Sequence, residues 1–211
     1  MCIWDKFFEQ EELRWKSPHE RVVALTPLLR ARGFRSILDL GCGAGRHLVY
    51  LARGGYEVYG ADISENGLRH ARKWLDRERL PARLVRSDMS AIPFDDGSFE
   101  TVICTHTIQH QTWRGMQQTM SEIRRVLRPT GLLFFTCPSR RDRRYGRGEE
   151  LEPNTFIEAE GPDMGVPHHY SNLGEVEALL EGFVIRKIEL LEQLEEHAHS
   201  YSHWKILGER E

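Results

Sequence analysis

Short runs of apolar, β-branched residues alternate along the chain with segments whose apolar positions recur every three or four residues. The short runs predict buried strands, and the periodic segments predict amphipathic helices. Regular alternation of the two is typical of a mostly parallel sheet covered by helices, so the expected fold class is α/β. The predicted strands are residues 36–40, 57–61, about 82–86, 99–104 and 132–136, followed by an antiparallel pair at 183–190 and 203–207.

The predicted helices between these strands have recognisable ends. The first follows a glycine loop and ends at Gly54, and the second begins at Ser64 as N-cap and ends before Pro81. A later helix begins at Ser171 as its cap and ends at Gly182. Between them, one helix carries an apolar stripe that we interpret as core contacts rather than a ligand surface. That stripe consists of Trp113, Met116, Met120, Ile123 and Leu127.

Residues 138–170 interrupt the alternation, because they are rich in charged residues, proline and glycine and show little periodicity. A long structureless loop inside a compact domain is usually functional, and we expect this one to be a substrate lid. Residues 1–34 are expected to be a helical segment, with Trp4 and Trp15 shaping the pocket. At 211 residues the chain is long enough for one well-cored domain, so residues 1–211 are predicted to form a single domain.

The composition narrows the range of partners. A formal net charge of −3 gives no general attraction to nucleic acid or to an anionic membrane, and we expect neither as a partner. The sequence shows no secretory signal and no apolar run near the roughly 18 residues that span a bilayer. Its four cysteines are far apart, which disfavours a disulfide framework and fits a reducing cytoplasm. Monomer and homodimer both remain open.

A glycine loop follows the first predicted strand. Gly41, Gly43 and Gly45 form a G-x-G-x-G pattern, and Asp39 precedes it by two residues. Glycines here let the backbone approach a ligand and leave helix N–H groups facing it. The nicotinamide pattern G-x-G-x-x-G fails, since Arg46 occupies its third small position. A carboxylate at Asp39 suits a cationic amino group better than a pyrophosphate.

Acidic residues end the next two strands. Asp62 can accept both hydroxyls of a ribose, although it can also be a helix-capping residue beside Ser64. Asp88 can accept an adenine amino group, with Ile63 and Met89 against the ring, or it can simply form a turn. Because ligands bind at the carboxyl edge of open α/β sheets, the three signals together predict a nucleoside site.

These motifs resemble the class I S-adenosylmethionine-dependent methyltransferase superfamily over roughly residues 35–137. The resemblance includes the glycine loop, Ala61-Asp62-Ile63-Ser64, and the segments 88–94, 99–104 and 122–134, with Thr130 where a second glycine is usual. Residues 41–71 are most similar to enzymes of tellurite resistance and ubiquinone biosynthesis. The resemblance implies a Rossmann-like, doubly wound, three-layer αβα fold. Its seven-stranded sheet would have the order 3-2-1-4-5-7-6, with strand 7 antiparallel.

The same resemblance implies S-adenosylmethionine as cofactor and S-adenosylhomocysteine as product. It places the methionine moiety at the glycine loop, the ribose at Asp62 and the adenine at Asp88. The expected cofactor-binding residues are Asp39, Gly41, Cys42, Gly43, Gly45, Asp62, Ile63, Asp88, Met89 and Thr105.

Histidines are the candidates for contact with the methyl acceptor. His106 and His110 follow the fourth strand, and either can act as a base or merely be a polar residue near a helix start. His169 closes the irregular segment and is a third candidate, although adjacent histidines also occur in surface turns. His197, His199 and His203 form an H-x-H-x3-H run. We expect no metal there, because no carboxylate or cysteine partner is evident.

The arginine-rich block of residues 140–147 has two interpretations. It is either one half of a solvated lid that the following glutamates neutralise, or a site that recruits an anionic acceptor. The leading functional hypothesis is methyl transfer to a small molecule by in-line displacement. The alternatives are a tRNA-modifying methyltransferase and a non-catalytic nucleotide-binding scaffold, and a nicotinamide oxidoreductase is disfavoured by Arg46.

Overall fold

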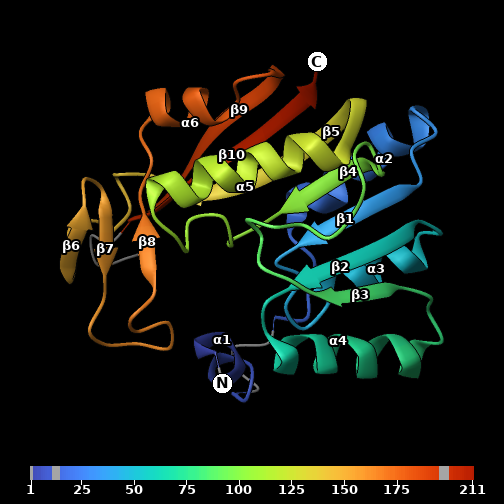
Figure 1. Cartoon of the computed structure of the whole chain (residues 1–211), viewed down its shortest axis with the longest axis horizontal. Coiled ribbons are helices and arrows are strands. Elements are labelled where there is room, and N and C mark those ends of the chain that lie inside the picture. Colours follow the sequence, from blue (N-terminus) through green and yellow to red (C-terminus); the bar gives the residue numbers. More distant parts are fainter. Residues whose placement is uncertain (1, 11–14, 195–199) are drawn as a thin grey trace.

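The computed structural model describes residues 2–10, 15–194 and 200–211. Within them, seven strands form one mixed sheet in the order β3-β2-β1-β4-β5-β10-β9 (Figure 1). Strand β10 is antiparallel to both of its neighbours, and the other pairs are parallel. The strand order that the resemblance implied is therefore confirmed. The strands are β1 (Ser36–Leu40), β2 (Glu57–Asp62), β3 (Arg83–Arg86), β4 (Phe99–Cys104), β5 (Leu127–Pro138), β9 (Phe183–Leu194) and β10 (Ser200–Arg210).

Most helix ends follow the predicted signals. Ser64 is an N-cap whose hydroxyl accepts the N–H of Gly67, and Gly54 is a C-cap. The last helix differs, because its N-cap is Asn172, whose side chain accepts from Glu175, and not Ser171. The described helices are α1 (Ile3–Phe7), α2 (Glu20–Ala31), α3 (Arg46–Arg53), α4 (Glu65–Glu78), α5 (Trp113–Val126) and α6 (Leu173–Leu179). None of them has the length and apolar character needed to cross a membrane.

Both faces of the sheet are buried, and each has its own core. Leu133 and Phe135 of β5 pack with α5 and α6, whereas Leu132 and Phe134 pack with α2, α3 and α4. Successive side chains of a strand point to opposite faces, so continuous apolar runs are required in such strands. The predicted stripe of α5 lies in the first core, where Met116 and Ile123 are fully buried.

The segment 138–170 is not the structureless loop that the sequence predicted. It contains a second, antiparallel sheet of three strands, β6 (Glu149–Glu152), β7 (Thr155–Ile157) and β8 (Pro167–His169). Asn154, with φ of 66°, makes the turn between the first two strands. Strands of three or four residues are too short to show a period of two, which explains why the pattern gave no signal.

The carboxyl ends of β1 to β4 point to one edge of the sheet. The small sheet and α1 both lie on that side (Figure 1). Helix α1 is attached to the start of α4, because Asp5 Oδ1 accepts the hydroxyl of Ser64 at 3.0 Å and the N–H of Asn66 at 3.2 Å. The edge of the sheet is thereby covered by two separate parts of the chain.

Candidate active site

A cavity of about 540 Å³ lies at this covered edge. Its walls come from the glycine loop, from the ends of β2, β3 and β4, from α1 and from the small sheet with the loop before it. This volume lies within the range of sites for cofactors and drug-sized ligands. Of the predicted cofactor-binding residues, all except Asp39 line it.

The glycine loop forms one end of the cavity, and its backbone conformation requires glycine at three positions. Gly41, Gly43 and Gly45 have φ values of 74°, 51° and 92°, a backbone conformation that other residues rarely adopt. A Cβ on Gly43 would lie 2.7 Å from the ring of Phe8, and a Cβ on Gly41 would collide with Thr107. The loop is therefore shaped so that its backbone, not its side chains, faces the cavity.

Asp62 connects the end of β2 to this loop. Its Oδ2 accepts the N–H of Gly43 at 2.7 Å, and its Oδ1 accepts the N–H of Ser64 at 2.8 Å. Burial raises the pKa of this carboxyl to about 6, and the charges of Asp39 and Asp5 add to the rise, while the two N–H donors oppose it. Each oxygen has a second lone pair, so the carboxylate can also accept hydroxyl groups from a ligand in the cavity.

Asp39 lies beneath the loop rather than in the cavity wall. It is 1% exposed, and its Oδ1 is 3.4 Å from Nδ1 of His47, whose Nε2 accepts the N–H of His19. Its Oδ2 has no hydrogen-bond partner among the described residues. Direct contact between Asp39 and a ligand amino group thus remains a prediction, and His47 is a partner that sequence reasoning missed.

The predicted adenine contacts surround another part of the cavity. Asp88 accepts the N–H and hydroxyl of Ser90 through Oδ1, which fixes the carboxylate in its turn. Met89 contacts the amide of Gln111, and Ile63 leaves 37% of its surface exposed. These residues provide one hydrogen-bond acceptor and two apolar surfaces, and their contact with adenine stays a prediction.

Three imidazoles lie close together near the end of β4: His106 after β4, His203 of β10 and His19 before α2. His106 has φ of 54°, and its ring centroid lies 5.2 Å from that of His203 and 5.7 Å from that of His19. Burial lowers the pKa of His19 to about 4 and that of His203 to about 3, with neighbouring positive charges adding to the effect. The pKa of His106 is also lowered, by burial and then by His203 and Arg46. Each lowered pKa favours the neutral form of the ring, which can accept a hydrogen bond.

His110 lines the same cavity, next to His168 of β8. Their ring centroids are 4.8 Å apart, and burial, followed by the proximity of His168, lowers the pKa of His110 well below its usual value. Asp163 lies beside them. Burial raises the pKa of Asp163, but His168 and Arg144 outweigh it and hold the carboxyl ionised.

His169, the third predicted catalytic histidine, does not reach the cavity. Its Nδ1 lies 2.8 Å from the hydroxyl of Thr155, and its ring packs on Trp113. Neighbouring residues of a strand point to opposite faces, so β8 directs His168 into the cavity and His169 away from it. His203 of the H-x-H-x3-H run lines the cavity, whereas His197 and His199 lie outside the described residues.

Comparison with known proteins agrees with this geometry. A methyltransferase-domain family matches residues 37–131. Malonyl-[acyl-carrier protein] O-methyltransferase of Salmonella typhimurium is 34% identical over 147 residues, which are 66% of this chain and 56% of that protein. Among solved structures, a methyltransferase of Methanosarcina mazei superposes with a TM-score of 0.74 at 23% identity, covering 87% of this chain and 97% of the other.

TehB of Haemophilus influenzae has the same fold, with a TM-score of 0.70 at 14% identity over 99% of this chain and 67% of the other. The matched residues 37–131 are a methyltransferase domain of the class I S-adenosylmethionine-dependent type. The chain spans about half the length of the curated relatives it matches. The predicted resemblance to the superfamily is therefore confirmed.

Aromatic side chains from the first residues form the roof of this methyltransferase cavity. Trp4, Phe7 and Phe8 come from α1 and its end, and Trp15 follows. Trp15 lies under the guanidinium of Arg46, 4.5 Å from the ring centroid, and Arg46 also contacts the Thr105 hydroxyl. Sequence reasoning expected Trp4 and Trp15 near the pocket. It did not identify Arg46 as a lining residue, because Arg46 was considered as part of a sequence motif and not as a side chain that faces the cavity.

Two further lining residues had no signal in the sequence. Asp163 and Tyr201 are brought to the cavity by the small sheet and by β10, respectively. Arg144, from the arginine block, pairs with Glu158 at 2.7 Å and with Asp163 at 3.1 Å. The positive and negative halves of this segment thus neutralise each other at this point, as the first interpretation of the block expected.

Proposed function

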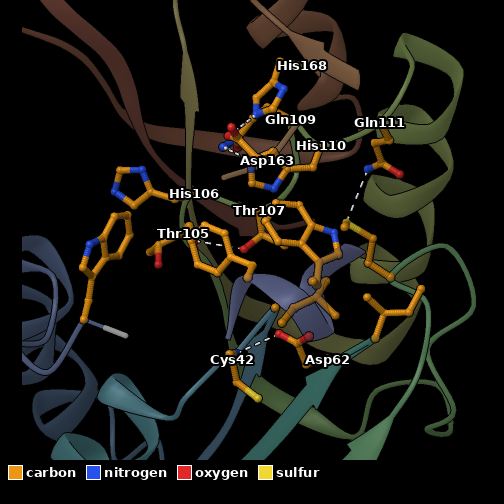
Figure 2. A pocket seen from close by; sticks show the side chains of 18 of the residues that line it. Cys42, Asp62, Thr105, His106, Thr107, Gln109, His110, Gln111, Asp163 and His168 are labelled. Carbon is orange, nitrogen blue, oxygen red and sulfur yellow. Dashed lines mark hydrogen bonds and ion pairs between the residues drawn. The ribbon is translucent and has the colours of Figure 1, made fainter. Parts of the chain in front are cut away.

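We propose that this chain transfers the methyl group of S-adenosylmethionine to a small molecule held at the histidine end of the cavity. The proposal rests chiefly on the division of the cavity into two ends. Figure 2 shows Cys42 and Asp62 at one end of the pocket, and His110, Asp163 and His168 at the other. A cofactor and a second reactant can therefore be held in one enclosed volume.

The residues at the first end match the chemical groups of the cofactor. Asp62 provides a carboxylate for ribose hydroxyls, and the backbone at Gly41 and Gly43 leaves room for the methionine chain. Asp88 and Met89 provide an acceptor and an apolar face for adenine. When bound, S-adenosylmethionine supplies an electrophilic methyl group on a sulfonium.

The second end can orient an acceptor and remove its proton. Since methyl transfer is an in-line displacement, holding the acceptor at the correct angle and distance contributes much of the acceleration. His106 lines this end of the cavity, so its imidazole is placed to orient an acceptor and to receive the proton of a poorly ionised hydroxyl, thiol or amine. The aromatic roof and the small sheet cover part of this end of the cavity.

A small acceptor fits the enclosure better than a macromolecule does. Both covers are part of the chain, and Asp5 fastens α1 to α4. The Salmonella relative is named for methylation of a malonyl group on a carrier protein, so a carboxylate acceptor carried on a thioester belongs among those to be tested. Arg144 of the arginine block already pairs with Glu158 and Asp163, which disfavours its contact with the phosphates of tRNA. A tRNA acceptor is therefore the alternative and not the leading proposal.

A product-release assay tests this function. The protein is incubated with S-adenosylmethionine and a panel of thiols, phenols, quinol precursors, short carboxylates, acyl-carrier thioesters, oxyanions and bulk tRNA. We expect acceptor-dependent formation of S-adenosylhomocysteine with one small-molecule class and none with tRNA. Turnover on tRNA that falls steeply with salt would support the alternative instead. Absence of cofactor binding by calorimetry would favour the scaffold.

A further inference from the structure

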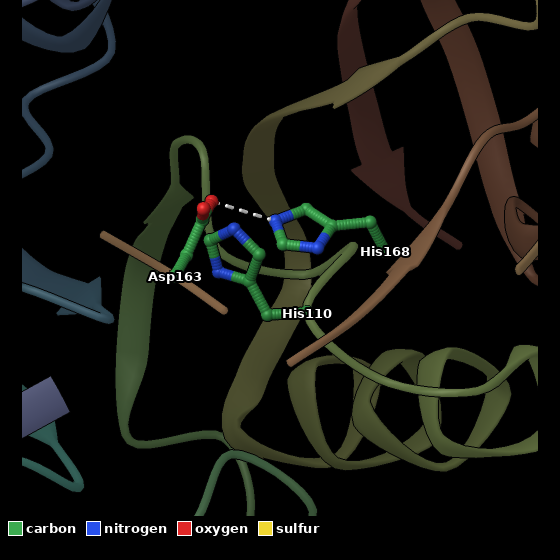
Figure 3. Close-up of side chains that lie close together, drawn as sticks. All are labelled: His110, Asp163 and His168. Atoms are coloured by element: carbon green, nitrogen blue, oxygen red, sulfur yellow. Dashed lines mark ion pairs between the residues drawn. The ribbon is translucent and has the colours of Figure 1, made fainter. Parts of the chain in front are cut away.

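His110, Asp163 and His168 form a compact cluster at the acceptor end of the cavity. One ring nitrogen of each histidine and one oxygen of Asp163 all lie within 4.8 Å of one another. The three come from different parts of the chain: the loop after β4, the loop between β7 and β8, and β8 itself. Figure 3 shows the two rings and the carboxylate directed toward one another.

The tautomer of His168 leaves a lone pair on its Nε2 that faces a lone pair on Oδ2 of Asp163. Its Nδ1 is 3.0 Å from the carbonyl oxygen of Val166, and a carbonyl only accepts, so Nδ1 carries the proton. Its Nε2 is 3.0 Å from Oδ2 of Asp163 but makes no hydrogen bond among the described residues. A bare ring nitrogen and a carboxylate oxygen at this distance repel, unless a cation lies between them.

That cation can be a proton or a metal ion, and His110 favours the metal. Two ligands about 2.1 Å from one ion stand about 3.0 to 3.4 Å apart, which matches the separation of His168 and Asp163. A proton between these two needs no third partner. His110 brings a third donor atom within 4.8 Å of the other two, and a backbone carbonyl orients His168 in the way typical of metal-bound histidines.

The local charge also permits a cation. Arg144 contacts both oxygens of Asp163 at 3.1 Å and would repel a metal ion if its charge were not balanced. Its Nε pairs with Glu158 at 2.7 Å. Arg144 thus lies between two carboxylates, and Arg144, Asp163 and Glu158 together carry one net negative charge beside the cluster.

We propose that His110, Asp163 and His168 bind a divalent transition-metal ion such as Zn²⁺, Co²⁺ or Fe²⁺. Two imidazoles and one carboxylate are the ligand set these ions accept, and three protein ligands leave open positions. The cluster lines the cavity, so an open position is accessible to a ligand there. This departs from the expectation, drawn from the sequence, that the chain binds no metal.

The ion also defines an acceptor class, an inference that rests on the proposed function. A thiol or hydroxyl bound to the ion would lose its proton more readily, and the imidazole of His106, which lines the same cavity, would receive that proton. The resulting anion attacks the methyl carbon as the carbon–sulfur bond of the sulfonium breaks. The electron pair of that bond stays on sulfur, which becomes the neutral thioether of S-adenosylhomocysteine.

Co²⁺ titration of chelator-treated protein tests the site without any acceptor. We expect one equivalent of Co²⁺ with visible absorption bands, and at least tenfold weaker binding in His168→Gln and Asp163→Asn. His203→Gln changes a neighbouring histidine of the same cavity and should bind Co²⁺ as the unmodified protein does. Circular dichroism verifies that each variant is folded. No Co²⁺ binding below about 1 mM, or equal loss in His203→Gln, overturns the proposal.

Cofactor binding to the metal-free protein separates this proposal from the proposed function. If calorimetry shows S-adenosylmethionine binding but Co²⁺ does not bind, the metal site is wrong and the methyltransferase function stands. With an accepted thiol or hydroxyl substrate, chelation should lower turnover at least tenfold, and Zn²⁺ or Co²⁺ should restore it. Turnover unchanged by chelation overturns the role of the ion in activating the acceptor.

Discussion

The Oδ2 of Asp62 accepts the backbone N–H of Gly43 at 2.7 Å. This bond joins the end of β2 to the glycine loop after β1, so two adjacent strand ends hold each other in place. The carboxylate is thus fixed before any ligand arrives, with one lone pair of each oxygen used by the backbone. Preorganisation of this kind reduces the entropy that a ligand loses on binding.

Removal of this carboxylate should weaken cofactor binding. We expect Asp62→Ala to raise the Kd for S-adenosylmethionine by about 1 to 3 kcal/mol, or roughly 5- to 150-fold, because hydrogen bonds to a charged acceptor are lost. Calorimetry measures the change. Asp76→Ala removes an exposed aspartate from α4 and should leave the Kd unaltered. Equal affinities for Asp62→Ala and Asp76→Ala would show that the ribose lies elsewhere.

Cofactor binding should also depend on pH around the pKa of Asp62. Burial raises this pKa from 3.8 to about 6, so the folded state favours the protonated carboxyl. The resulting stabilisation of the fold is greatest below pH 3.8 and is lost as the pH rises through 6. Ribose hydroxyls donate to the ionised form, so the affinity should rise from pH 5 to pH 7, by about tenfold at most per unit. 5′-Methylthioadenosine, which lacks the amino acid moiety, isolates this effect in a fluorescence titration. An affinity that is flat between pH 5 and 7, or that falls, contradicts the assignment.

The glycine at position 43 should be irreplaceable for a steric reason. Its φ is 51°, and an added Cβ would lie 2.7 Å from Phe8. We expect Gly43→Ala to abolish measurable cofactor binding and to displace α1. Gly33→Ala is a matched control, since Gly33 also has positive φ, 68°, but open space around its Cβ. The control should lose about 1 kcal/mol of folding stability and keep its affinity; if both variants bind alike, crowding at Gly43 is unimportant.

The sequence was sufficient to predict the large sheet and the cofactor end of the site. Buried parallel strands require continuous apolar runs, and the positive φ values of the loop require glycine. Both features can therefore be recognised from residues that are close together in the sequence. Ser64 as N-cap and Asp62 at the end of β2 are signals of the same local kind. At the acceptor end, His106 and His110 were predicted from their place after β4, and both line the cavity. The rest of that end left no local signal in the sequence.

Asp163 illustrates why the rest of that end could not be predicted. It reaches the cavity only because β7 and β8 pair, with Phe156 opposite His168, and no short-range pattern records that pairing. The choice between His168 and His169 depends on which face of a three-residue strand points inward. A one-residue difference in register reverses that choice, and the sequence alone does not set the register of so short a strand.

Helix α1 should control the rate at which the cofactor leaves. Asp5 holds it to α4 through Ser64 and Asn66, and these donors, together with the N–H of Cys2, outweigh burial and lower the pKa of Asp5 to about 2. Asp5→Ala removes these contacts while Ser64 still accepts from Gly67, so α4 keeps its cap.

We therefore expect Asp5→Ala to fold normally but to release S-adenosylmethionine faster. Loss of about 1 to 3 kcal/mol of anchoring would open the aromatic roof more often and raise the dissociation rate several-fold, which stopped-flow fluorescence of Trp4 and Trp15 can follow. Lys6→Ala changes an exposed residue of the same helix and should leave the rate as it is. If Asp5→Ala and Lys6→Ala release the cofactor at the same rate, α1 is a fixed wall and dissociation proceeds past the small sheet instead.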